Sequence, residues 1–150
     1  MLIGILFSVL LLVYIAWLFI RYCTLIISNK KAYKAFFALH EQINKRYGIL
    51  LSKLDSYNEN EKLVSETKGF INKAVQFSYQ KEGVDRIIRF ANAIFDNAKQ
   101  LGLTVNEDTE FNNAKFHYNK CAQKLKYYVD VFPTSLMARL AHIQFLDSLK

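Results

Sequence analysis

The feature that most constrains this chain is an uncharged, apolar stretch at residues 2–20. Only Gly4 and Ser8 in this stretch fall outside the apolar set. At a rise of about 1.5 Å per residue, a helix of this length spans roughly 28 Å, close to the thickness of the hydrocarbon core of a bilayer. The sequence therefore predicts one membrane crossing.

The composition of the remainder is that of an ordinary folded domain. The 150 residues are 52% hydrophobic, with the excess concentrated in the first stretch, and one Pro and five Gly are too few for a disordered segment. Two cysteines exclude a disulfide scaffold and multi-cysteine metal motifs. The net charge of +7 favours anionic surfaces without naming a partner.

The apolar stretch is predicted to be a retained anchor. A cleaved signal peptide has basic residues before a shorter apolar core, whereas this chain starts Met-Leu-Ile and leaves the stretch through Arg21. A pilin-like protein, the alternative, would carry a Glu early in the apolar helix, and none occurs there. Tyr14, Trp17 and Tyr22 suit the headgroup zone.

Charges near the stretch predict its orientation. Arg21, Lys30, Lys31 and Lys34 all follow it and no basic residue precedes it, which places the C-terminal part in the cytoplasm by the positive-inside rule. We expect a single-pass protein of a cell (inner or cytoplasmic) or organelle membrane. Lys30, Lys31 and Lys34 are candidate contacts for anionic lipid headgroups, worth about 1 kcal/mol each near the surface.

The rest of the chain shows helical periodicity and no strand alternation. Four stripes recur at spacings of three and four: Phe36, Leu39, Ile43, Tyr47, Leu50 and Leu54; Val64, Ile71, Val75 and Tyr79; Ile87, Ile88, Ala91, Ile94, Phe95, Ala98 and Leu101; and Phe111, Ala114, Tyr118, Cys121, Leu125, Tyr128 and Phe132. The last has the heptad pattern of a coiled coil or bundle helix. The predicted fold is all-α: a transmembrane anchor over residues 1–28, then an antiparallel bundle of about four helices over residues 29–150.

Residues that start and stop helices punctuate these stripes. Turn-forming residues fill positions 55–60, Gly83 is expected to end the second helix as a left-handed cap, and the third helix is expected to stop at Gly102. Thr104 and Glu107 have capping-box spacing for the fourth helix, which Pro133 ends.

Two further features concern the ends of the domain. A last amphipathic segment, capped by Thr134 or Ser135, is expected to bury the apolar residues Leu136, Leu140, Ile143, Phe145 and Leu146. Residues 25–29 are the most favourable place for a bend between the anchor and the first helix, because Ser28 and Asn29 favour caps.

The sequence offers no catalytic or metal-binding pattern. His40, His117 and His142 are far apart and have no second ligand at helical spacing, so no metal is expected. Cys121 lies on a core stripe without a local His to activate it. No glycine-rich loop can hold a phosphate. We predict no enzyme, no cofactor and no small-molecule substrate.

Basic residues gather in the fourth predicted helix, beside tyrosines. Lys115, Lys120, Lys124 and Lys126 could form a basic strip facing anionic lipid or nucleic acid. Lysines mixed with tyrosines in a bundle helix more often form a solvated face, and nucleic acid is not the expected partner. A peripheral binder of anionic lipid or nucleic acid is the alternative function.

Several short motifs resemble the LemA family. They are the block Ala114-Lys115-Phe116-His117-Tyr118-Asn119, then Phe132-Pro133 and Ala138, and earlier Leu63-Val64 with Lys68-Gly69-Phe70. The family's second Tyr-Asn pair falls on Leu125 and Lys126 here, and the chain is short, so the resemblance identifies a divergent, shortened member.

The resemblance implies a limited set of properties. LemA proteins are membrane-anchored helical bundles without an established catalytic activity, some of them associated with other envelope or organelle-membrane proteins. Tyr118, Asn119, Phe132 and Pro133 are the residues that carry over, and the role expected for them is to pack the fourth helix and turn the chain. With the anchor, this predicts a scaffold whose partners are membrane lipid and another membrane protein or a second copy.

Overall fold

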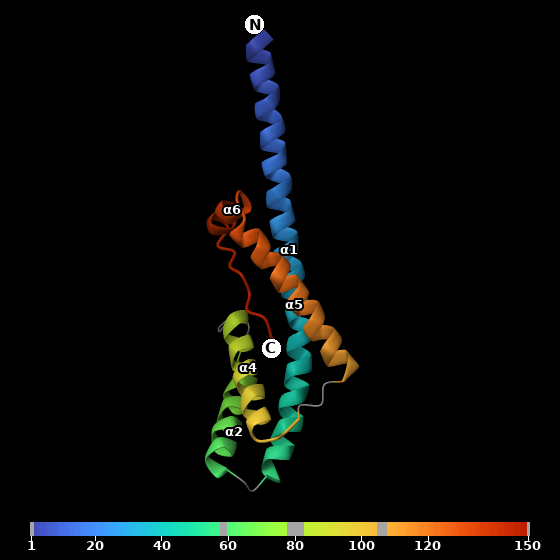
Figure 1. Ribbon diagram of the computed structural model, residues 1–150, viewed down its shortest axis with the longest axis vertical. Helices are drawn as coiled ribbons and strands as arrows, with labels where there is room; N and C mark the ends of the chain where they lie inside the picture. The colour runs from blue at the N-terminus through green and yellow to red at the C-terminus, as the bar shows by residue number, and fades with distance from the viewer. Residues whose placement is uncertain (1, 58–59, 78–82, 105–107, 150) are drawn as a thin grey trace.

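The computed structural model describes residues 2–57, 60–77, 83–104 and 108–149, with side chains from residue 5 onward. These residues form five helices and no strand (Figure 1). The helices are α1 (Leu2–Asp55), α2 (Glu61–Val75), α4 (Val84–Gln100), α5 (Thr109–Asp130) and α6 (Thr134–Leu140). The predicted all-α class is confirmed.

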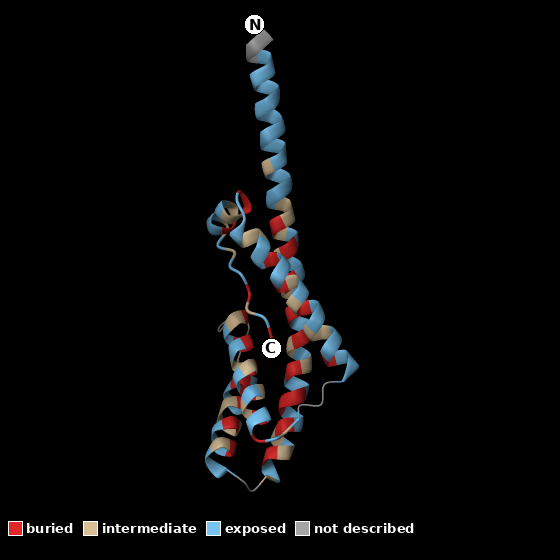
Figure 2. Ribbon diagram, in the orientation of Figure 1, coloured by how far each residue is buried: buried red, intermediate tan, exposed pale blue. Residues whose placement is uncertain are grey.

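Helix α1 joins the apolar stretch to the rest of the molecule without interruption. It contains no Pro, and it continues through residues 25–29, where Ser28 is buried instead of capping a helix end. Its first part stands free of the other helices, and residues 5–17 are exposed (Figure 2). Residues 5–20 are here named the apolar segment. It is the one helix among the described residues that is long and apolar enough to cross a membrane.

The other helices pack along the second half of α1 (Figure 1). α5 runs antiparallel to it, since Gln42 hydrogen bonds Glu110 at 3.5 Å while the rings of Phe36 and Tyr118 lie 6.1 Å apart. α2 and α4 pack against each other at the end of α1 farthest from the apolar segment. α6 lies against α1 at the other end of this packed part, which begins at Leu25.

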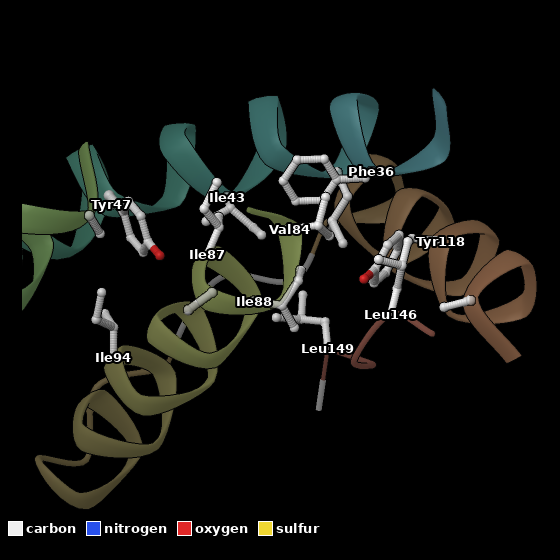
Figure 3. Packing of buried hydrophobic residues seen from close by; sticks show 14 of the residues in the cluster. Phe36, Ile43, Tyr47, Val84, Ile87, Ile88, Ile94, Tyr118, Leu146 and Leu149 are labelled. Atoms are coloured by element: carbon white, nitrogen blue, oxygen red, sulfur yellow. The ribbon is translucent and has the colours of Figure 1, made fainter. Parts of the chain in front are cut away.

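The core follows the predicted stripes of α1 and α4. All six stripe residues of α1 are buried, as are six of the seven in α4, Phe95 being half-buried. In Figure 3, Phe36, Ile43 and Tyr47 of α1 face the isoleucines of α4 across the core. A helix in contact with neighbours on one side buries a stripe of period 3.6, which is why periodicity located these faces correctly.

The predicted end of the second helix is wrong. α2 stops at Val75, which is exposed although it was assigned to the core, and Tyr79 and Glu82 lie outside the described residues. Gly83 does have a positive φ of 76°, but it precedes the first residue of α4. A glycine marks the left-handed position without saying which neighbouring helix uses it.

The end of α4 is as predicted. Gly102 has a φ of 69° and its N–H donates to the carbonyl of Lys99, while the N–H of Leu103 donates to that of Ala98. These two bonds satisfy the last carbonyl groups of the helix and constitute a Schellman motif.

The start of α5 differs from the expected capping box. Asp108 is the N-cap, its Oδ1 accepting the N–H of Phe111 at 2.8 Å, and Thr104 lies outside the helix while Glu107 is outside the described residues. An aspartate cap also places negative charge at the positive end of the helix, which stabilises the helix further.

The predicted stripe of α5 holds until its last residue. Phe111, Tyr118 and Leu125 are buried, and Ala114, Cys121 and Tyr128 are half-buried. Phe132 is 71% exposed, because α5 ends two residues earlier and the helical register no longer applies.

α6 buries the opposite face from the one predicted. Thr134 and Ala138 are buried, whereas Leu136 and Leu140 are exposed. Neither Thr134 nor Ser135 is the cap: Pro133 occupies that position, and the Thr134 hydroxyl donates to the Val131 carbonyl at 2.6 Å.

The segment after α6 is not helical as predicted, since residues 143–149 return toward α4 in an extended course (Figure 1). Leu146 is buried as expected, Ile143 is half-buried, and Phe145 is exposed. The last part of this segment, residues 146–149, is here named the C-terminal tail.

Candidate functional site

The C-terminal tail is held by α5 through two adjacent residues of the Tyr-Asn motif. The Tyr118 hydroxyl donates to the Asp147 carbonyl at 2.6 Å. The Asn119 side chain makes two bonds to the backbone of Leu149: its Nδ2 donates to the carbonyl at 2.8 Å, and its Oδ1 accepts the N–H at 2.9 Å. Two parallel bonds from one amide fix the tail in register along α5.

The same tail is held by α4 through charged and polar groups. Arg89 Nε donates to the Asp147 carboxylate at 2.7 Å, an ion pair that raises the pKa of the guanidinium. The Asp85 carboxylate accepts the Asp147 N–H at 3.0 Å, and Asn92 Nδ2 donates to the Ser148 carbonyl at 3.2 Å. α4 and α5 also meet through the Phe95 and Phe111 rings, which lie edge-to-face with centroids 6.0 Å apart, so the tail adds a second connection between these helices.

Buried apolar contacts complete this connection. Leu146 and Leu149 are buried in the same core as Ile88 and Val84 of α4 (Figure 3). Sequence reasoning missed Asp85, Arg89 and Asp147, and nothing in the chain marks them as partners, since 58 positions separate Arg89 from Asp147.

Removal of the paired bonds to Leu149 gives a direct test of the tail. Asn119→Ala is expected to destabilise the protein by about 1–3 kcal/mol, because it leaves two half-buried backbone groups of Leu149 without their partners. Denaturation measured by circular dichroism gives the change in unfolding free energy, and hydrogen exchange at the Leu149 amide should accelerate. The exposed Asn113→Ala is the control, and equal behaviour of the two variants would contradict the role of Asn119.

The four motif residues therefore have different surroundings. Tyr118 is buried with its ring 6.1 Å from that of Phe36 in α1, whereas the Asn119 side chain binds the C-terminal tail. Pro133 is buried at the start of α6, where the chain turns, and the Phe132–Pro133 peptide bond is cis. Phe132 packs nothing in the core.

The lysines of α5 do not lie on one side of the helix. Because each residue turns about 100°, Lys115 and Lys126 face within about 20° of each other, while Lys120 and Lys124 face about 140–180° away from Lys115. Lys126 Nζ lies 5.6 Å from the centre of the Phe145 ring. Two pairs on different faces make a weaker anionic-surface site than the continuous strip considered from the sequence.

Lys30, Lys31 and Lys34 are exposed on α1. In a continuous helix, the ten residues from Ile20 to Lys30 correspond to about 15 Å along the axis. If the membrane crossing ends at Ile20, these lysines lie at the outer edge of the headgroup zone, where the electrostatic attraction to anionic lipid is already weaker.

The histidines and cysteines are not brought together. Among the described residues, no group of three His, Cys, Asp or Glu side chains could hold a metal ion. His40 stacks on the Phe36 ring at 5.5 Å, and burial lowers its pKa. Cys23 and Cys121 are free, half-buried thiols.

A buried arginine joins α1 to the start of α5. Arg46 Nη2 lies 2.5 Å from Asp108 Oδ2, and its guanidinium carbon lies 5.4 Å from the centre of the Phe111 ring. The close contact with the Arg46 guanidinium, followed by the hydrogen bond from the Phe111 N–H, lowers the pKa of the exposed Asp108 carboxylate. The cap of α5 is thus also the counter-charge of a buried cation.

The stability provided by this pair should depend on pH. Because the folded-state pKa of Asp108 lies below its ordinary 3.8, the stabilisation is full above that value and is lost as the pH falls through the lowered pKa. Asp108→Asn keeps an effective cap but removes the charge, so we expect it to lower the melting temperature at neutral pH and not at strongly acidic pH. Glu110→Gln, which removes a neighbouring carboxylate of α5, should show a smaller and less pH-dependent change. A pH-independent effect of Asp108→Asn would contradict the ion pair.

No family model matches the chain, and no curated protein or solved structure is similar to it.

Proposed function

We propose that this chain is a membrane-anchored helical bundle of the LemA type that serves as a non-catalytic interaction scaffold at the membrane surface. The observation that carries the proposal is the continuity of α1, which is both the apolar segment and the central helix of the packed part. A domain built around the extension of its own anchor keeps a fixed orientation relative to that anchor.

The exposed side chains of the apolar segment support the anchor. Only 6% of the residues in its most apolar 18-residue stretch are buried, so this part of α1 does not belong to the core of the protein. Large apolar side chains such as Phe7, Leu12 and Phe19 face outward on every side. Removing each from water is worth about 1.5–3 kcal/mol, which a bilayer supplies and an aqueous environment does not.

The arrangement around this helix supports the bundle. α5 lies antiparallel along α1, and α2 and α4 cover the far end, which corresponds to about four packed helices with short connections. The basic residues Arg21, Lys30, Lys31 and Lys34 on this side of the apolar segment favour a cytoplasmic location for it, in a single-pass protein.

The motif residues support a structural role for the LemA resemblance. The polar groups of Tyr118 and Asn119 form hydrogen bonds with the backbone of the C-terminal tail and so attach the end of the chain to α5. Exposed apolar side chains on the packed part, among them Phe116 and Tyr127 of α5, are available to a protein partner.

Cross-linking in the membrane tests the scaffold role. A photoreactive residue is introduced at Phe116 or Tyr127 of the full-length protein, and the cross-linked products are identified by mass spectrometry. The control is a chain that ends at Asn29, keeps the apolar segment and carries the photoreactive residue at Tyr22, so that it reports captures made by the anchor alone. We expect recurrent capture of one membrane protein, or of a second copy, that the control lacks. Capture of lipid only, or the same proteins from both chains, would contradict the scaffold.

A further inference from the structure

Helix α6 has an inverted amphipathic pattern. Its small residues Thr134 and Ala138 are buried against the rest of the protein, while its large residues Leu136 and Leu140 point away. At about 100° per residue, the two leucines lie within about 40° of each other and on the side opposite Ala138. Leu140 is 75% exposed, more than any other large apolar side chain of the described residues. These two leucines are here named the α6 patch.

Helix α6 lies beside α1 near the end of the apolar segment. Tyr22 of α1 lines one hollow together with Met137, Leu140 and Ala141 of α6. Tyr22 lies two residues, or about 3 Å along the helix axis, beyond the end of the apolar segment at Ile20. Leu140 of the α6 patch therefore lies beside α1 close to the end of the apolar segment, and helix α6 lies at the level of that part of α1 (Figure 1).

Residues at the same level have the chemistry of a membrane interface. The Arg21 guanidinium carbon lies 5.4 Å from the centre of the Trp17 ring, and the Tyr14 and Trp17 rings are stacked at 5.9 Å. Tryptophan and tyrosine concentrate at the headgroup level of bilayers. On α6, the exposed Arg139 lies about 60° around the helix from Leu136, where its cation can meet a lipid phosphate.

We propose that α6 lies in the headgroup and upper acyl region of the same bilayer that α1 crosses, with the α6 patch toward the acyl chains and Arg139 on the lipid phosphates. The protein then contacts the membrane at two places, one spanning and one interfacial. Short apolar helix faces with a flanking cation are typical of interfacial segments. The proposal rests on the proposed function, because it requires α1 to cross the membrane.

Depth-dependent fluorescence quenching tests this position in the full-length protein. Trp17, the only tryptophan, is changed to Phe, and a single tryptophan is introduced as Leu136→Trp or Leu140→Trp. The variants are reconstituted in vesicles of equal parts phosphatidylcholine and phosphatidylglycerol, with bromine on the upper acyl carbons of the former. Circular dichroism checks that each variant is folded, which is expected because both positions are exposed.

The control is Phe116→Trp in the same Trp17→Phe background. Phe116 is also an exposed aromatic side chain, but it lies beyond the level of Phe36, about 24 Å along α1 from Ile20. We expect the tryptophan at position 136 or 140 to be quenched at least about twofold more strongly than the control, since interfacial helices sit about 5–10 Å into the boundary.

The unmodified protein separates the two possible failures. If Trp17 of the wild-type protein is quenched while position 136 and position 140 are no more quenched than position 116, α1 is inserted and the interfacial contact is wrong. If Trp17 itself is not quenched, the anchor and with it the proposed function are wrong.

Discussion

Leu125→Asp is expected to unfold the packed part of the protein. Leu125 of α5 is 0% exposed and belongs to the apolar core, so the substitution places a carboxylate among apolar side chains. An unpaired buried charge costs several kcal/mol, comparable with the whole stability of a domain of this size. Circular dichroism of the full-length protein in detergent micelles should show loss of helix from the packed part while the apolar segment keeps its own.

Phe132→Asp is the matched control for this prediction. It introduces the same charge seven residues later on the heptad pattern, but Phe132 is 71% exposed beyond the end of α5. We expect its unfolding free energy to remain within about 0.5 kcal/mol of wild type. A Leu125→Asp protein that melts like wild type would show that the register of α5 is wrong.

Phe36→Ala is expected to destabilise the protein by about 3–5 kcal/mol. The Phe36 side chain is 0% exposed and lies between α1 and α5, where its ring meets Tyr118. Truncation leaves a cavity at the main contact of the fold in addition to losing the transfer free energy of the ring. Chemical denaturation in micelles measures the change.

The neighbouring Phe37→Ala is the control, because Phe37 is 51% exposed on the adjacent face of the same helix. We expect a loss below about 1 kcal/mol, since little buried area disappears and the helix propensity improves. Similar losses for the two variants would mean that α1 does not present the observed face to α5.

The buried faces of long helices that pack on one side only were predictable from the sequence. The α1 and α4 stripes were assigned correctly because each helix has a core on one side and solvent on the other, the condition under which apolar period reports burial. α6 does not meet this condition, because its large apolar residues Leu136 and Leu140 are exposed. The apolar pattern therefore identified the exposed face of α6 and not its buried face. Periodicity identifies which residues share a face but not which medium that face contacts.

The attachment of the C-terminal tail could not be predicted for a different reason. Asn119 binds the backbone N–H and carbonyl of Leu149, groups that every residue other than proline carries, so the partner has no signature in its side chain. The motif resemblance singled out Tyr118 and Asn119 as a pair, and their contacts explain why a phenol and an amide stand there.

If α1 crosses the membrane as proposed, its continuity makes it a lever. From Ile20 to Asp55 the helix extends about 52 Å, so a tilt of about 20°, usual for single spans, displaces its far end by about 18 Å. A flexible joint at the membrane would absorb such a rotation, whereas an uninterrupted helix would carry it to its end at Asp55. Changes in bilayer thickness would therefore be converted into lateral sweeps of the distal helices α2 and α4.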